Sequence, residues 1–399
     1  MSLICRVWPV WYVLPVLHAA PRATSNRANM SSPLLFSPLR LRSLELPNRI
    51  VVSPMAQYSA VDGVATDWHL MHMGSLAVSG AGLFIVEATS IEAQARVSPH
   101  CLGLWSDRHE QALARIVAFC KEHGGAKLGI QLMHSGRKGS VGAPWHGQKE
   151  VAAEQGGWQT WSPSDVPYPG RSAPRVLSRS DLAAVRQRYV DAARRADRIG
   201  FDLLELHNAH GYLLHSFLSP LSNVRDDEYG GSLENRMRFP LEVFHSMREV
   251  WPGHKPMGVR ISATDWAPRG WTIEDSVVFA KALKALGCDY VTASSGGSSS
   301  EQEIPVHPGY QLPFAETIRR EAGIATMGVG LITEPEQAEQ ALQQGRVDLV
   351  ALGRAMMYQP RWAWHAAEKL GADAYFPPQY ARSHPSMRKR DFLKAVRES

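Results

Sequence analysis

One stretch decides which fold to expect: Phe201-Asp-Leu-Leu-Glu-Leu-His207-Asn-Ala-His210-Gly-Tyr212-Leu-Leu-His-Ser-Phe-Leu-Ser-Pro220. Its first half is apolar and of strand length, and polar, chemically competent side chains follow directly. In a parallel α/β sheet, the carboxyl ends of the strands carry side chains into a crevice instead of a packed core. We therefore expect an active site at the end of this strand.

His207, His210 and Tyr212 suit one chemical task. Two imidazoles can donate hydrogen bonds to a substrate oxygen as negative charge develops on it, and a nearby phenol can supply a proton. Two other interpretations stay open on the residues alone. The histidines could ligate zinc in a barrel hydrolase, although no third ligand follows at ligand spacing. They could also be structural histidines with satisfied hydrogen bonds.

Strand-like runs recur along the chain with helix-length segments between them. Most are apolar and rich in β-branched residues, as strands covered on both faces should be. The runs are Arg49–Ser53, Leu83–Ala88, Lys127–Met133, Phe201–His207, Met257–Ile261, Tyr290–Ser294, Ala325–Gly328 and Leu349–Leu352. Eight β–α repeats in one chain predict an α/β fold of the closed (β/α)8 TIM-barrel type before they predict a doubly wound sheet.

Helix starts support this pattern. We expect Ser180 to cap a helix that runs to about Arg198, Thr272 to cap a second and Thr333 to cap a third. Two segments lie outside the repeat. Leu39–Pro47 alternates like a hairpin that seals the barrel floor. Ser135–Ser178 is a long extended loop after the third strand, which indicates a lid or binding loop, or else a surface excursion without a role.

Composition narrows the class of protein. The 399 residues are 44% hydrophobic and 20% charged, with a net charge of +5, which is typical of a soluble globular protein. No basic block interleaved with aromatic residues precedes Arg388-Lys-Arg390, so we expect no nucleic-acid partner. The apolar run Val7–Leu17 is too short to span a bilayer. Four scattered cysteines form no metal or disulfide framework, which indicates a reducing, cytoplasmic location.

The chain divides into three expected parts. Residues 1–30 form an extension that is disordered or precedes the true start at Met30. Residues 31–382 form one barrel domain, because no composition shift marks a linker. Residues 383–399 form a basic tail, helical or disordered.

Seven motifs carry a resemblance to a known family. They are Ser53-Pro-Met-Ala-Gln-Tyr58, Glu87-Ala88-Thr, Gln131-Leu-Met-His-Ser-Gly-Arg137, His207-x-x-His210-Gly-Tyr212, Phe217-Leu-Ser-Pro-Leu-Ser-Asn223, Asp227-Glu-Tyr-Gly-Gly-Ser-Leu-Glu-Asn-Arg236 and Gly353-Arg354. Together the motifs resemble the Old Yellow Enzyme family of FMN-dependent ene-reductases. The finer likeness is to the bacterial subgroup of xenobiotic reductases and NADPH dehydrogenases, and it runs from Leu34 to Arg382.

The resemblance implies that FMN binds noncovalently at the carboxyl ends of the barrel strands. The residues implied to line the flavin ring are Ser53, Pro54, Met55, Ala56, Ala88, Gln131 and Arg260, and those implied to hold the phosphate are Gly330, Gly353 and Arg354. The role of Arg260 makes physical sense, because a fixed guanidinium near flavin N1 stabilises the anionic reduced flavin.

The resemblance also implies an activity. NADPH, or NADH, reduces the flavin, and an α,β-unsaturated carbonyl compound then binds with its oxygen between His207 and His210, while Tyr212 protonates the α carbon. Asn208 is expected to point away. Tyr58 reaches over the substrate. Arg382 matches an arginine that enters the neighbouring subunit's site, which implies a homodimer or homotetramer; otherwise Arg382 is a solvated tail charge.

Departures and alternatives set limits to this expectation. Ala56 stands where the subgroup commonly has cysteine, so thiol-tuned behaviour is not expected. Larger dienoyl-CoA or trimethylamine-type dehydrogenases carry closely spaced cysteines for an iron–sulfur cluster and a further nucleotide domain. We expect neither in this chain, which argues against this alternative. A catalytically idle flavin-binding protein is the remaining alternative, and the complete His, His and Tyr set argues against it. The sequence does not identify the substrate. It also does not distinguish NADPH from NADH, because it has no GxGxxG fingerprint.

Overall fold

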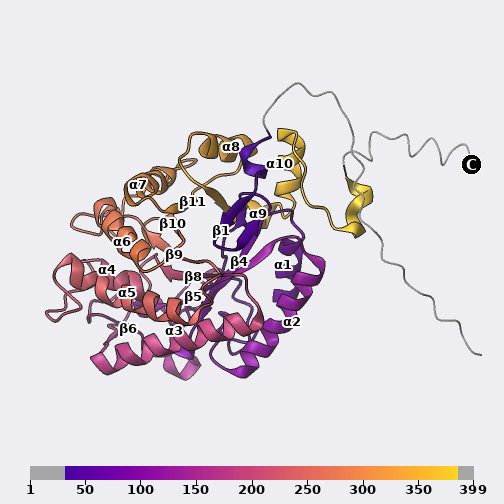
Figure 1. Cartoon of the computed structure of the whole chain (residues 1–399). Coiled ribbons are helices and arrows are strands. Elements are labelled where there is room, and N and C mark those ends of the chain that lie inside the picture. The colour runs from indigo at the N-terminus through magenta and orange to yellow at the C-terminus, as the bar shows by residue number, and fades with distance from the viewer. Residues whose placement is uncertain (1–31, 385–399) are drawn as a thin grey trace, which may run out of the picture. The chain divides into compact units, whose positions relative to one another are not determined.

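The computed structural model describes residues 32–384, whose central feature is a closed barrel of eight parallel strands surrounded by helices (Figure 1). The barrel strands are β3 (Ile50–Val52), β4 (Leu83–Ser90), β5 (Lys127–Met133), β8 (Leu203–Asn208), β9 (Met257–Ser262), β10 (Tyr290–Ser294), β11 (Ala325–Gly328) and β12 (Leu349–Leu352). They follow one another around the barrel in chain order, and β12 pairs with β3 to close it. The predicted TIM barrel is confirmed, with strand ends shifted by two residues at most.

Ten α-helices surround or cap the barrel. They are α1 (Asp67–Ala77), α2 (Asp107–His123), α3 (Arg179–Ile199), α4 (Leu213–Leu218), α5 (Leu233–Val250), α6 (Ile273–Ala285), α7 (Leu312–Ala322), α8 (Pro335–Gln343), α9 (Arg354–Tyr358) and α10 (Trp362–Leu370) within the described residues. Short 3-10 turns are η1 (Leu34–Phe36), η2 (Ala93–Ala95), η3 (Gly136–Lys138), η4 (Pro144–His146), η5 (Ala153–Gln155) and η6 (Pro378–Ser383).

Two of the three predicted helix caps were placed wrongly. Thr272 caps α6 as expected, because its side chain accepts a hydrogen bond from the Asp275 backbone. The cap of α3 is Ser178 and not Ser180, since the Ser178 hydroxyl and the carboxylate of Asp181 form a reciprocal capping box. The cap of α8 is Glu334 and not Thr333, because the proline that follows it takes the first helical position.

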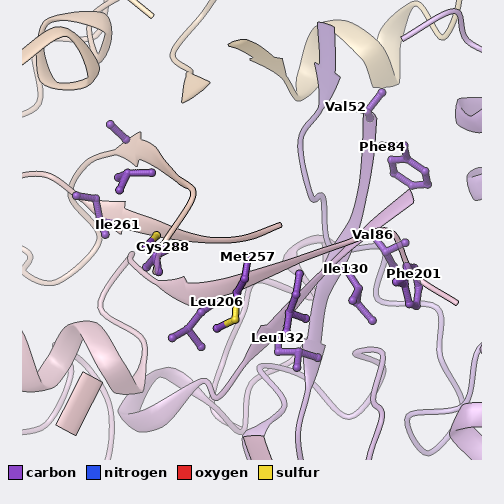
Figure 2. Packing of buried hydrophobic residues seen from close by; sticks show 14 of the residues in the cluster. Val52, Phe84, Val86, Ile130, Leu132, Phe201, Leu206, Met257, Ile261 and Cys288 are labelled. Atoms are coloured by element: carbon purple, nitrogen blue, oxygen red, sulfur yellow. The ribbon is translucent and has the colours of Figure 1, made fainter. Parts of the chain in front are cut away.

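Successive side chains of each barrel strand point to opposite faces, so the strands lie between two apolar clusters. Side chains of one parity pack against the helices, and Figure 2 shows this outer cluster with Val52, Phe84, Val86, Ile130 and Leu132 from successive strands. Side chains of the other parity fill the barrel floor. The same parity points the later residues of these strands, where they are polar, toward the barrel mouth.

The predicted N-terminal hairpin closes the floor. Strands β1 (Leu39–Leu41) and β2 (Leu44–Leu46) pair antiparallel. Leu41 and Leu46 are buried in the same cluster as the inward-facing strand residues. Sealing this end excludes water from the bottom of the barrel, so ligands can reach its interior through the other end.

The segment 135–178 contains only short elements. They are η3, η4, η5 and the two-residue strands β6 (Trp161–Ser162) and β7 (Arg175–Val176), which pair with each other. Within the described residues no helix is long and apolar enough to cross a membrane. Cys101, Cys120 and Cys288 are buried free thiols. The expected extension 1–30, and the expected tail after its first two residues, lie outside the described residues.

Candidate active site

A cavity of about 420 Å³ lies at the carboxyl ends of the barrel strands. Eight of the predicted site residues line it: Ser53, Pro54, Met55, His210, Arg260, Gly330, Gly353 and Arg354. Further lining residues that the sequence did not single out include Ser294, Ser295, Tyr310, Gln311, Leu331 and Met357. The mouth of the barrel is therefore where separate parts of the chain meet, as the strand pattern predicted.

The loop after β3 is held in place from β4. A bulge in β4 leaves Glu87 without a partner in the ladder and brings Ala88 opposite Gln131 of β5. The freed Glu87 carboxylate accepts the backbone N–H of Gln57 at 3.0 Å and lies 3.4 Å from the His69 imidazole. The backbone of 53–56 is thereby fixed at the edge of the cavity.

The two catalytic candidates His207 and His210 belong to one hydrogen-bonded relay. Nδ1 of His207 accepts the backbone N–H of Ala209 at 3.2 Å, so the neutral ring carries its proton on Nε2. That Nε2 donates to Nδ1 of His210 at 3.2 Å. The second ring then carries its own proton on Nε2, 3.0 Å from the Ser294 hydroxyl, which donates onward to the carbonyl of Ile261 at 2.8 Å. Every proton in the relay has a defined place.

Electrostatics keep both imidazoles neutral. Burial first, and the positive charge of Arg260 next, lower the pKa of His207 and of His210 well below its usual value of 6.5. Burial and the neighbouring Tyr58 raise the pKa of Tyr212. The pair can therefore act as neutral hydrogen-bond donors beside a phenol that stays protonated.

The loop that carries these groups has a strained backbone. His210 has φ +58° and Gly211 has φ +73°. A side chain at Gly211 would not fit, because its Cβ would lie 2.4 Å from the carbonyl oxygen of Gly297. Lys138 joins the loop that contains His210 to the loop that contains Gly297, because its ammonium donates to the carbonyls of both residues at 2.7 Å each.

A buried pair behind the loop adds a second support. The backbone N–H of Gly211 donates to Nδ1 of His215 at 2.8 Å. The other nitrogen of His215 lies 3.2 Å from the carboxylate of Asp265, which also accepts from the Ser219 hydroxyl. These contacts explain why the His210 conformation persists despite its cost of roughly 1–3 kcal/mol.

Tyr58, Ala88 and Tyr212 pack together on an apolar cluster beside the cavity. Tyr58 has φ +50°, and burial raises its pKa to about 12. The indole of Trp145, on η4 of the long loop, meets its ring edge-on at 5.7 Å and is 64% exposed. The long loop therefore reaches the site, which favours the lid interpretation over a surface excursion.

Not every predicted residue joins this group. Arg382 lies on η6, is exposed, and makes no hydrogen bond or ion pair with any residue between 32 and 384. Asn208 is fully buried but its amide bonds to neither histidine, in line with the expectation that it points away. Ala56 is exposed at the cavity edge.

Comparison with known proteins then identifies the family. The profile of the NADH:flavin oxidoreductase / NADH oxidase family matches residues 34–373. The chain belongs to this family. It is therefore an FMN-dependent oxidoreductase of the Old Yellow Enzyme type, as the motifs led us to expect.

Relatives match over nearly their whole length. An NADPH dehydrogenase of Geobacillus sp. (strain WCH70) is 47% identical over 352 residues, which are 88% of this chain and 98% of that protein. The NADPH dehydrogenase of Bacillus subtilis (strain 168) is 43% identical over 351 residues, 87% of this chain and 98% of that one. The solved structure of morphinone reductase has a TM-score of 0.72 at 28% identity and covers 90% of this chain and 94% of its own.

The cavity residues of this flavin oxidoreductase fit FMN. No carboxylate of the described residues lies within 4.0 Å of the Arg260 guanidinium, so this partly buried cation can face an electron-rich ring. Gly330 has φ +119°, which only glycine adopts readily, and Gly353 lines the cavity next to Met55 and Ser53. Together with the exposed Arg354, these glycines offer the backbone amides and the charge that a phosphate needs.

The geometry of the described residues and the family membership remove two alternatives. A zinc hydrolase would need a third ligand, and the described part of the chain has no group of three His, Cys, Asp or Glu side chains suited to a metal. An idle flavin-binding protein conflicts with membership of a family of oxidoreductases. Sequence reasoning missed Ser294 and Lys138, because a lone serine at a strand end and a lysine in a loop are common surface features.

Proposed function

We propose that this oxidoreductase is an NADPH dehydrogenase with ene-reductase activity, which oxidises NADPH, or NADH, and reduces the C=C bond of α,β-unsaturated carbonyl compounds. The observation that carries the proposal is the contact of His207, His210 and Tyr212 in one group, of which His210 lines the cavity. The names of the NADPH dehydrogenase relatives support the hydride donor.

FMN would lie across the barrel mouth. The ring would meet the backbone of 53–56, Ala88, Gln131 and Arg260, and the phosphate would meet Gly330, Gly353 and Arg354, which supports a noncovalent site built by six strands. When bound, FMN accepts a hydride from the nicotinamide and later passes a hydride to the β carbon of the enone.

The two imidazoles would hold the substrate's carbonyl oxygen. Nε2–H of His207 donates to Nδ1 of His210 and would turn to the substrate oxygen when it binds. His210 can donate from Nδ1 if its proton moves from Nε2, and the Ser294 hydroxyl, 3.0 Å away, can then donate to the vacated Nε2. Two such donors stabilise the negative charge that develops on the oxygen, and losing one typically costs on the order of 10²–10³ in rate.

Tyr212 would deliver the proton to the α carbon. Its ring centroid lies 5.0 Å from that of His207 and 6.4 Å from that of His210, so the phenol faces the same space as both imidazoles. Because its pKa is raised, Tyr212 arrives protonated and can act as a general acid.

Tyr58 and Trp145 would form the roof over the substrate. Their edge-to-face contact joins the loop after β3 to the long loop after β5. An aromatic pair in this position favours flat, conjugated substrates, because such surfaces stack or pack edge-on against its rings.

Arg382 would complete the site of a neighbouring subunit. It makes no hydrogen bond or ion pair with the residues between 32 and 384, and an exposed arginine on a short turn can extend toward a partner. We therefore propose that the protein assembles as a homodimer or homotetramer. We further propose that residues 31–382 form one barrel domain and that the protein is cytoplasmic.

Two half-reactions test this function. The purified protein should show a flavin spectrum that NADPH bleaches without oxygen and that 2-cyclohexenone restores, with cyclohexanone as the product. A flavin that is bleached by NADPH but not restored by cyclohexenone or by a maleimide would contradict the ene-reductase proposal.

A further inference from the structure

A fully buried carboxyl group, Glu205, lies inside the barrel two residues before His207 on β8. One of its oxygens accepts the side-chain N–H of Gln131 at 2.7 Å. The other accepts the hydroxyl of Thr292 at 2.6 Å. Since both oxygens accept hydrogen bonds, the group has the pattern of an ionised carboxylate. The reaction proposed above gives it no task.

A structural reason alone does not account for a carboxylate here. Burying a charge costs several kcal/mol, and an apolar side chain would fill the barrel interior without that cost. The inward residues nearer the floor are indeed apolar, and Tyr290 fills the space above Gly258, where a Cβ would come within 2.3 Å of its ring. Glu205 is the polar exception, and on β8 it is the inward-facing residue next to His207 of the histidine relay.

Its contacts lead to the flavin site from two sides. Gln131 is one of the residues proposed to meet the flavin ring, and its amide orientation is fixed by the bond to Glu205. Thr292 lies two residues before Ser294 on β10, the hydroxyl that ends the histidine relay. A shift of Glu205 would therefore move side chains on both β5 and β10.

Its charge acts on a third group. Arg260 is the sheet partner of Thr292, the residue that donates to Glu205, and no ion pair joins Arg260 to the carboxylate within 4.0 Å. Burial raises the pKa of Glu205 above its usual value, and the guanidinium of Arg260 and the hydrogen bonds from Thr292 and Gln131 oppose this rise. The guanidinium is thus partly balanced by a negative charge it does not touch, and remains open toward the cavity.

We propose that Glu205 is a positioning and tuning residue for the flavin: it orients the Gln131 amide and offsets the charge of Arg260, so that the enzyme stabilises the reduced, anionic flavin less than an uncompensated arginine would. The inference rests on the proposed placement of FMN. A moderated flavin benefits both half-reactions, because the nicotinamide must be able to reduce it and the enone must be able to reoxidise it.

Replacing the charge while keeping the shape gives the sharpest test. Glu205→Gln should leave an uncompensated Arg260 beside the flavin, and this favours the anionic reduced form. At a fixed solution potential, the ratio of reduced to oxidised flavin should rise about tenfold, which corresponds to about 30 mV for a two-electron couple. Thr292→Val should shift the ratio in the same direction by a smaller factor, because a carboxylate that loses a donor binds a proton more readily.

Glu339→Gln is the matched control. Glu339 is also a buried carboxylate that accepts hydrogen bonds on both oxygens, from the backbone of Leu34 and Leu35 at 2.9 and 2.8 Å and from the side chain of Gln343 at 2.8 Å, but it lies on α8 and does not line the cavity. It should lower thermal stability and leave the flavin equilibrium within about twofold of the wild type. Anaerobic reduction of each FMN-loaded protein against a reference dye measures the ratio, and titration of each apoprotein with FMN measures affinity.

The outcomes separate cleanly. A tenfold rise for Glu205→Gln, with Glu339→Gln unchanged, supports the proposal. An unchanged or lowered ratio overturns it, and so does an equal rise in the control. If Glu205→Gln does not fold, Thr292→Val decides by the same sign. A wild-type protein that neither binds FMN nor accepts hydride from NADPH would instead refute the proposed function, which these variants do not test.

Discussion

At the scale of single residues, the site depends on where protons rest. His207 receives a backbone N–H on one nitrogen and therefore presents a proton on the other. No charged acid or base near neutral pH is needed for this, because burial holds both imidazoles neutral and Tyr212 protonated. A substrate oxygen would meet the Nε2–H of His207 in place of Nδ1 of His210, and a second donor once the proton of His210 moves to its Nδ1.

Lys138 should give the enzyme its pH dependence near neutrality. Burial, and the charge of Arg137 next, lower the pKa of Lys138 to about 7. Its ammonium fastens the His210 carbonyl and lies 5.4 Å from the centre of the Tyr212 ring. As the pH rises through about 7 this positive charge is lost, so charge developing on the substrate is stabilised less.

We expect the rate of flavin reoxidation by cyclohexenone to fall by about tenfold between pH 6 and pH 9. This corresponds to a rise of roughly 1.4 kcal/mol in the activation free energy. Lys138→Met should be slow throughout and flat over this range. Stopped-flow traces at fixed enone concentration measure both profiles. A wild-type profile that is flat, or a variant that keeps the step near pH 7, would assign the titration elsewhere.

At the scale of the elements, the sequence carried most of the fold. Continuous apolar runs such as Leu83–Ala88 have one physical cause, the two-sided burial of barrel strands, so they predicted the strands well. Helix starts were harder, because Ser178 and Ser180 are equally good caps until Asp181 chooses between them through its reciprocal hydrogen bonds. The bulge at Glu87 had no sequence signal, although it sets the direction of Ala88.

The hairpin β1–β2 should matter for stability more than for chemistry. Leu46 is fully buried on the barrel floor, so Leu46→Ala removes buried methyl groups and leaves a cavity there. We expect the free energy of unfolding to fall by about 2–5 kcal/mol. Urea unfolding followed by circular dichroism measures this change.

The same variant should keep the wild-type affinity for FMN when measured under folding conditions. Leu46 is not one of the residues that line the cavity, and the hairpin that carries it closes the opposite end of the barrel. A loss of FMN affinity without loss of stability would show that the two ends are coupled.

At the scale of the whole molecule, the candidate site could be predicted only in part. Motifs gave the residues on β3, β8, β9 and the last two loops, because glycine, histidine and arginine at strand ends have few structural explanations. Ser294, Lys138 and Trp145 entered only through three-dimensional contacts with residues distant in sequence. Ordinary residue types acquire a role from their neighbours, and a single sequence does not show which neighbours they have.

Arg382 offers a test that depends on assembly. If it completes a partner's site, Arg382→Ala should raise the KM for the enone about tenfold or more and keep FMN content. Coexpression with His207→Ala/His210→Ala should then restore part of the activity, because mixed dimers contain one intact site that receives the arginine of the inactive subunit. Size-exclusion chromatography with light scattering verifies that mixed dimers form. Mixed dimers without any recovered activity would leave Arg382 as a solvated charge.

The histidine pair itself is tested most directly by single-turnover reoxidation. FMN in wild-type protein and in His207→Ala/His210→Ala is first reduced with NADPH, and 2-cyclohexenone is then added in a stopped-flow instrument. We predict that the variant binds FMN and is reduced by NADPH, while its reoxidation by the enone slows by at least on the order of 10²–10³. Reoxidation of the variant at the wild-type rate would contradict the role given to both imidazoles.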